Sequence, residues 1–178
     1  MVILIDGATH SGKTVLMQRL IERFNYPALS VDHLKMGLIR SGQTSLTPSD
    51  DDKLKGYLWP IIREMIKTAI ENDQNLILEG LYFPPDWSRD FSEEYLPHIR
   101  YICLVMSEEY IRTHYSDIVA HRHDVEHRGE GDEPSPEELI FDHAEKLRNC
   151  REYGSPYILI DRDYTECVTD DAVDALLG

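Results

Sequence analysis

The chain has 178 residues, of which 42% are hydrophobic and 29% are charged, and its formal net charge is −15. This length and composition predict one globular domain over residues 1–178, and the negative charge argues against nucleic acid and anionic membranes as partners. No apolar run reaches the length of about 18 residues that a membrane span needs. The opening residues MVILID lack the basic segment of a signal peptide, so we expect a cytoplasmic protein.

The number and spacing of the cysteines bear on disulfides and zinc. Cys103, Cys150 and Cys167 are three in number and show no C-x-x-C spacing. This argues against a disulfide framework and against a zinc knuckle, so we expect reduced thiols.

Short, nearly continuous apolar segments alternate with helical patterns along the chain. The apolar segments predict strands buried on both faces, at 2–5, 28–31, 76–78, 101–105 and 157–160. Helices are predicted at 13–24, 33–39, 50–71, 108–121 and 136–153, with N-cap patterns at Ser107, Ser135 and Thr169. Pro60 is expected to kink the third helix or divide it in two, and the polar segments 41–52 and 123–135 are expected to be mobile loops. The alternation predicts the α/β class, with an open parallel sheet wrapped by helices.

Residues 7–14 read GATHSGKT and match the pattern G-x-x-x-x-G-K-[ST] between a predicted strand and a predicted helix. Such a loop can curl around phosphate with its backbone N–H groups pointing inward, because Gly7 and Gly12 supply torsional freedom and the helix adds its positive end. We expect Lys13 to contact the β- and γ-phosphates of a nucleotide and Thr14 to ligate Mg²⁺. The candidate nucleotide-binding residues of this loop are Gly7, Ala8, Thr9, His10, Ser11, Gly12, Lys13 and Thr14.

Two carboxylates follow predicted strands at the sheet edge where ligands bind in open α/β sheets. Asp32 is a candidate general base that orients an attacking hydroxyl and accepts its proton; the alternative is that it only caps the helix starting at His33. Arg40, two turns further, could pair with an anionic acceptor. Glu79 ends the third strand, where it could reach Mg²⁺ through water or touch the acceptor, or serve as a buried structural acid.

The segment after the fourth strand mixes arginines with acids and histidines. We expect a lid over about residues 121–133, in which at least one of Arg112, Arg122 and Arg128 neutralises charge on a transferring phosphoryl group. The alternative is a solvated helix face held by i,i+4 pairs. Residues 123–127 match H-x-x-E-H, but the glycines that follow would break the helix that a zinc site needs. The remaining histidines are expected at the surface or in the lid.

Together these residues resemble the small-molecule kinases of the P-loop superfamily, which include nucleoside monophosphate kinases, shikimate and gluconate kinases, 2-phosphoglycerate kinase and the zeta toxins. The resemblance spans nearly the whole chain, from GATHSGKT through SVDHLKMGLIRSG and LILEGLYFP to LRNCREYGSPYILIDRDY. It is closest to 2-phosphoglycerate-kinase-like proteins, in which an acid after strand two is followed by IR and strand three ends in EG before a proline. Adenylate kinases would show D-G-[FY]-P-R after strand three, where this chain has Glu79-Gly80-Leu81-Tyr82.

The resemblance implies a three-layer α/β/α P-loop NTPase fold, with a five-stranded parallel sheet in the order 2-3-1-4-5 and a lid. It implies a phosphotransferase that uses ATP and Mg²⁺ and acts on an alcohol group of a small, anionic metabolite. The acceptor would lie between Asp32, Arg40, Arg63 and Glu79, and Arg148 and Arg162 would hold the adenine or its phosphates. We expect a monomer or a homodimer.

Two other functions fit the same loop. A nucleotide-binding regulator or motor-like ATPase would use water, or nothing, as the acceptor, but the chain lacks room for the helical subdomains of AAA-type ATPases and offers a candidate acceptor pocket. A toxin-like kinase would phosphorylate a nucleotide sugar.

Overall fold

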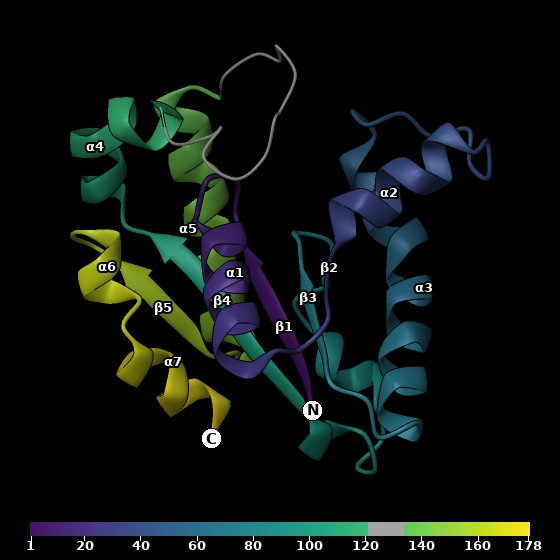
Figure 1. Cartoon of the computed structure of the whole chain (residues 1–178). Coiled ribbons are helices and arrows are strands. Elements are labelled where there is room, and N and C mark those ends of the chain that lie inside the picture. Colours follow the sequence, from purple (N-terminus) through teal and green to yellow (C-terminus); the bar gives the residue numbers. More distant parts are fainter. Residues whose placement is uncertain (121–133) are drawn as a thin grey trace.

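The computed structural model describes residues 1–120 and 134–178, which form a parallel sheet with helices on both faces (Figure 1). The strands are β1 (Val2–Gly7), β2 (Ala28–Ser30), β3 (Leu76–Glu79), β4 (Ile99–Met106) and β5 (Tyr157–Ile160). Their order in the sheet is β2-β3-β1-β4-β5, and every neighbouring pair is parallel. The predicted fold class and strand order are therefore confirmed.

The helices alternate with these strands as the apolar pattern predicts. They are α1 (Lys13–Phe24), α2 (Val31–Arg40), α3 (Asp51–Glu71), α4 (Glu108–Ala120), α5 (Pro136–Tyr153), α6 (Tyr164–Cys167) and α7 (Asp170–Leu177). The sequence pattern did not indicate α6 or the two short 3-10 helices, Trp87–Asp90 and Leu96–His98, because one helical turn carries no periodicity. None of the described helices is long and apolar enough to cross a membrane.

Alternate residues of the central strands face two separate parts of the core. On one face, Leu4 of β1 packs in a cluster with Leu58 of α3 and Cys150 of α5. On the other face, Ile5 of β1 packs in a cluster with Leu16 of α1 and with residues of α4 and α7. Because burial of each such side chain contributes about 1.5–3 kcal/mol, both faces of the sheet must be covered, and the result is the three-layer arrangement.

The predicted helix signals have mixed outcomes. Ser135 caps α5 in a full capping box with Glu138, as predicted. The prediction that Pro60 could divide the third helix is wrong, because α3 runs from Asp51 to Glu71 through it. Pro60 is exposed and so is Gly56, whose carbonyl loses its helical partner and can bond water instead, while buried residues on the other side of α3 hold it to the sheet.

Candidate active site

The loop between β1 and α1 has a backbone that requires its two glycines. Gly7 has φ 153° and Gly12 has φ 83°. A Cβ atom on Gly7 would lie 2.5 Å from Ser11 Oγ and 2.6 Å from the Leu104 carbonyl oxygen, and one on Gly12 would lie 2.4 Å from Cε2 of Tyr164. No side chain fits at either position without displacing a neighbour, so the tight curve of the loop depends on glycine at both.

The polar side chains of this loop fit a phosphate ligand. Lys13 is buried at the start of α1, and its Nζ donates to the Ala8 carbonyl oxygen at 2.9 Å, so the ammonium lies over the loop. Ser11 Oγ is buried and has no hydrogen-bond partner among the described residues, which leaves a hydroxyl to donate to a bound anion. Thr14 follows in the first turn of α1. The backbone N–H groups, Lys13 and Ser11 are the donors that nucleotide phosphates need, and the Thr14 hydroxyl is the ligand that their Mg²⁺ needs.

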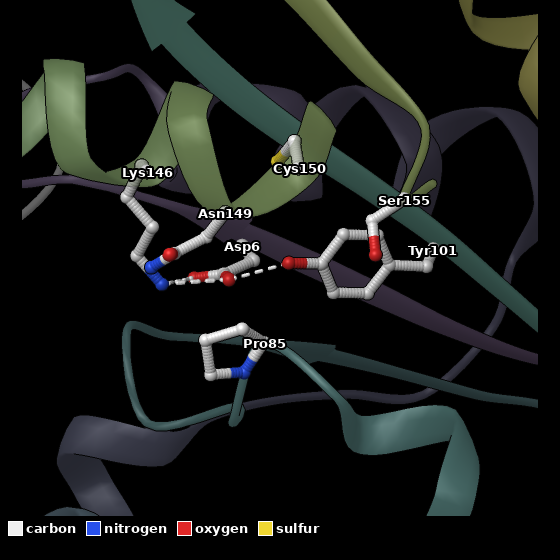
Figure 2. Close-up of a pocket in the computed structure, with 7 residues that line it drawn as sticks. All are labelled: Asp6, Pro85, Tyr101, Lys146, Asn149, Cys150 and Ser155. Carbon is white, nitrogen blue, oxygen red and sulfur yellow. Dashed lines mark hydrogen bonds and ion pairs between the residues drawn. The ribbon is translucent and has the colours of Figure 1, made fainter. Parts of the chain in front are cut away.

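A buried ion pair anchors the loop where it leaves β1. Asp6 is 1% exposed, and Lys146 of α5 lies 2.7 Å from both of its carboxylate oxygens. Tyr101 of β4 donates to Oδ2 at 2.6 Å and the Gly7 N–H donates to Oδ1 at 2.7 Å. Figure 2 shows Lys146 and Tyr101 reaching Asp6 from two elements beside a small cavity. Burial and the charge of Asp6 raise the pKa of Tyr101, so its hydroxyl stays neutral and donates.

A histidine of α5 contacts the same loop at a second point. His143 is 1% exposed; its Nδ1 accepts from the Met106 N–H at 2.9 Å, and its Nε2 lies 3.2 Å from the Thr9 carbonyl oxygen. Burial lowers the pKa of His143 to about 4. The expectation that the remaining histidines lie at the surface or in a lid is wrong for His143, because its position on α5 turns it toward the sheet edge.

The segment after β5 closes the other side of the loop. The Tyr164 hydroxyl donates to the Gly12 carbonyl oxygen at 3.0 Å, and its ring lies against Gly12. Burial raises the pKa of Tyr164, so this hydroxyl remains a donor over the physiological range. Sequence reasoning missed Asp6, His143, Lys146 and Tyr164, since no local pattern connects them to the loop.

A second polar group lies at the carboxyl ends of β2 and β3. Asp32 stands in the first turn of α2, whose N-cap is Ser30, so Asp32 is not the cap residue. Lys35 Nζ lies 2.7 Å from Asp32 Oδ1 and donates to the Tyr82 hydroxyl at 2.7 Å. The Tyr82 hydroxyl donates in turn to Asp51 at 3.2 Å, at the start of α3. Burial and the charges of Asp32 and Asp51 raise the pKa of Tyr82. We call these four side chains, Asp32, Lys35, Asp51 and Tyr82, the acceptor edge.

Glu79, the last residue of β3, is hydrogen-bonded to Ser30, the last residue of β2. It is 2% exposed and accepts a hydrogen bond from Ser30 Oγ at 2.6 Å. In the sheet it pairs with Ile5, so it lies one strand away from the start of the phosphate loop. This buried carboxylate therefore lies between the phosphate-loop end of β1 and the end of β2.

The structure does not bring all the predicted arginines to this region. Arg40 is exposed at the end of α2. Arg63 pairs with Glu64 at 2.8 Å and lies twelve residues after Asp51, the first residue of α3, which is about 18 Å along the helix axis.

Of the arginines predicted near the nucleotide, both are exposed. Arg148 lies 3.6 Å from Glu145 on α5. Arg162 lies between β5 and Tyr164, and its side chain is 3.5 Å from Glu166.

Several other expectations concern the chain around the predicted lid. Arg112 pairs with Glu108 at 3.0 Å on the surface of α4, as the solvated-face alternative predicts. Arg122, Arg128, the H-x-x-E-H stretch and the predicted lid lie outside the described residues. Within residues 1–120 and 134–178, no three His, Cys, Asp or Glu side chains form a group that could hold a metal ion by themselves.

A parallel sheet in this strand order, with a glycine- and lysine-bearing loop between β1 and α1, defines the P-loop fold. Solved structures of kinases share it. A Chloroflexus aurantiacus protein provisionally designated a kinase matches with a TM-score of 0.61 and 20% identity, over 99% of this chain and 95% of that one. A gluconokinase from Sinorhizobium meliloti matches with a TM-score of 0.58 and 18% identity, over 99% and 91%. A shikimate kinase from Bacteroides thetaiotaomicron matches with a TM-score of 0.54 and 15% identity, over 99% and 94%.

No family model matches the sequence, and no curated protein matches it. The structural matches show that the chain has the fold of the P-loop small-molecule kinases, and the predicted resemblance is confirmed at the level of the fold.

Proposed function

We propose that this protein transfers the terminal phosphoryl group of Mg·ATP to a hydroxyl group of a small, anionic metabolite. The observation that carries the proposal is the placement of the phosphate loop beside the acceptor edge, with Glu79 between them. The kinase neighbours support phosphoryl transfer in general, because they share the fold that creates this edge.

The donor side would hold the nucleotide through residues 7–14. The loop N–H groups and Lys13 would bind the β- and γ-phosphates, and Thr14 would bind Mg²⁺, with Glu79 reaching the ion through water. Bound Mg·ATP supplies the activated phosphoryl group. Arg162 and Arg148 would contact the adenosine end; the contact of Tyr164 with Gly12 supports this for Arg162, because it brings the segment after β5 to the nucleotide side.

The acceptor side would orient a hydroxyl and take its proton. Asp32 is partly exposed, at 29% of its side chain, and Lys35 holds one of its oxygens. A partly exposed carboxylate at this position is suited to general-base work, which contributes about 10²- to 10⁴-fold to rates. Glu79 is the second candidate for the base. Lys35, which contacts Asp32, and Arg40, at the end of the same helix, would be the cations that bind an anionic acceptor. Arg63 lies further along α3, so it would contact only an acceptor long enough to extend to it.

The direct test is a screen of hydroxyl-bearing metabolites with Mg·ATP, followed by mass spectrometry for the gain of one phosphoryl group. Panels of sugar acids, phosphorylated hydroxy acids and nucleotide sugars should be included, since the last class identifies the toxin-like alternative. Phosphorylation of an anionic metabolite is expected. Release of free phosphate without any phosphorylated metabolite would instead indicate a nucleotide-binding ATPase. A cytoplasmic location and a monomeric or homodimeric state stay predictions from the sequence.

A further inference from the structure

The side of α5 that faces the phosphate loop carries a buried imidazole between two backbone groups. We propose that His143 is a positioning residue for nucleotide binding: it holds the Thr9 carbonyl and thereby sets the direction of the next backbone N–H of the loop. The inference rests on the proposed function in one respect, that the loop binds phosphate. It assigns a role to a residue of the chain that lies more than a hundred positions beyond the motif itself.

The contacts of the ring determine its protonation state. The Met106 N–H can only donate, and it reaches Nδ1 at 2.9 Å, so Nδ1 carries no proton. The proton of the neutral ring is then on Nε2, which faces the Thr9 carbonyl oxygen at 3.2 Å and donates to it. The end of β4 therefore selects the tautomer that can bind the loop.

The Thr9 carbonyl controls the loop through the planarity of its peptide group. In a trans peptide the C=O and the following N–H point in opposite directions. With the Thr9 oxygen turned toward α5, the His10 N–H points away from α5. His10 has φ 65°, the left-handed conformation that occurs where successive N–H groups converge on an anion, and it is not a glycine. Such a conformation persists only where neighbouring contacts maintain it, and the bond from His143 is one of these contacts.

The position of the imidazole is itself fixed by the rest of α5. Lys146 lies three residues further along the helix, on the same side, and its ion pair with Asp6 ties α5 to the residue that precedes the loop. His10 and Lys13 also face the ring from the loop, and both disfavour a second positive charge there. His143 is thus a buried, neutral donor to a carbonyl oxygen of the phosphate loop.

The test is calorimetric titration of the full chain with a non-hydrolysable ATP analogue and Mg²⁺, and separately with inorganic pyrophosphate. His143→Asn can keep the bond from Met106, because its amide oxygen replaces Nδ1, but it is too short to reach Thr9. We expect its affinity for both probes to fall about tenfold, because only a fraction of loops then has the binding conformation. His143→Gln, whose amide can still donate toward Thr9, should lose about threefold at most.

The matched control is Leu139→Ala, which removes buried side-chain volume from α5 but no hydrogen-bond donor to the loop. It should lower the unfolding temperature as much as the histidine variants do, or more, and leave both affinities unchanged. Unchanged affinity in His143→Asn, at a temperature where all variants are folded, would overturn the inference.

The two probes separate this inference from the proposed function. If the wild-type protein binds pyrophosphate but not the ATP analogue, the proposed function is wrong, and the loss of pyrophosphate affinity in His143→Asn still decides the role of His143. Binding of neither probe by the wild-type protein overturns both.

Discussion

The phosphate loop and the acceptor edge are held by different kinds of contact. The loop is anchored by partly buried bonds that join distant parts of the chain: Asp6 to Lys146, Thr9 to His143 and Gly12 to Tyr164, separated by 140, 134 and 152 residues. The acceptor edge combines shorter separations: the bonds from Lys35 to Tyr82 and from Tyr82 to Asp51 span 47 and 31 residues. Asp32 and Lys35 are one helical turn apart, and both are more exposed than Asp6.

This difference separates what must be rigid from what can adapt. Donors that are held by such long-range bonds keep one geometry before a ligand arrives, which is how preorganised sites stabilise developing charge. A partly exposed pair such as Asp32 and Lys35 contributes little to stability, so its members can exchange partners when an acceptor binds. We infer that the loop defines a common reaction, while α2 and the start of α3 define which acceptor is used.

Removal of the loop cation is expected to have the largest effect. Lys13→Ala should reduce phosphoryl transfer about a thousandfold, because it removes the ammonium that lies over the loop and would neutralise the phosphate charge. Far-ultraviolet circular dichroism should show an unchanged fold. Lys67→Ala, which removes a lysine paired with Glu64 on α3, is the control and should keep full activity. Activity of Lys13→Ala near the wild-type level would show that the loop does not act in transfer.

The base at the acceptor edge should come next. Asp32→Asn keeps the shape of the side chain but removes the proton acceptor, so transfer should fall about a hundredfold while nucleotide affinity changes only a few-fold. Product formation and a nucleotide titration measure the two quantities. Asp174→Asn, at the far end of the molecule in a pair with Arg23, serves as the control. If transfer survives in Asp32→Asn, the base role passes to Glu79 or to no residue.

Acid should lower the stability of the native protein through His143. Burial lowers the pKa of His143 to about 4, against 6.5 for the free side chain. Between these values the unfolded chain binds more protons than the native protein, so stability rises with pH. The contribution is complete above about pH 6.5, is lost as the pH falls toward 4, and amounts to roughly 3 kcal/mol. Urea unfolding at pH 7 and pH 4.5 measures it. Identical pH dependence in wild type and His143→Asn would contradict the assignment.

The smallest effect is expected where the loop meets the segment after β5. Tyr164→Phe removes the hydrogen bond to the Gly12 carbonyl oxygen but keeps the ring against Gly12. Nucleotide affinity should fall about threefold, the range of one neutral hydrogen bond. Tyr26→Phe, which alters a tyrosine that stacks on Phe24 at the other end of α1, should leave the affinity unchanged. An equal loss in both variants would show that Tyr164 has no specific role.

Local patterns were sufficient for most elements of the fold. The apolar run over residues 2–5 predicted β1, and the bounds predicted for α1 and α5 agree with the structure, because periodicity and capping are properties of a few adjacent residues. The prediction that Pro60 could divide the third helix failed because packing of α3 on the sheet outweighs one missing hydrogen bond.

The sequence by itself determined the α/β alternation and the phosphate loop, since the motif requires glycine and lysine at positions only a few residues apart. Only the tertiary structure decided which residues support that loop. Lys146 and His143 reach it because α5 packs across the sheet edge, while Arg63 is carried away because α3 extends along the sheet. These partners are far apart in the chain, and their meeting depends on how whole helices pack, which no short-range pattern records.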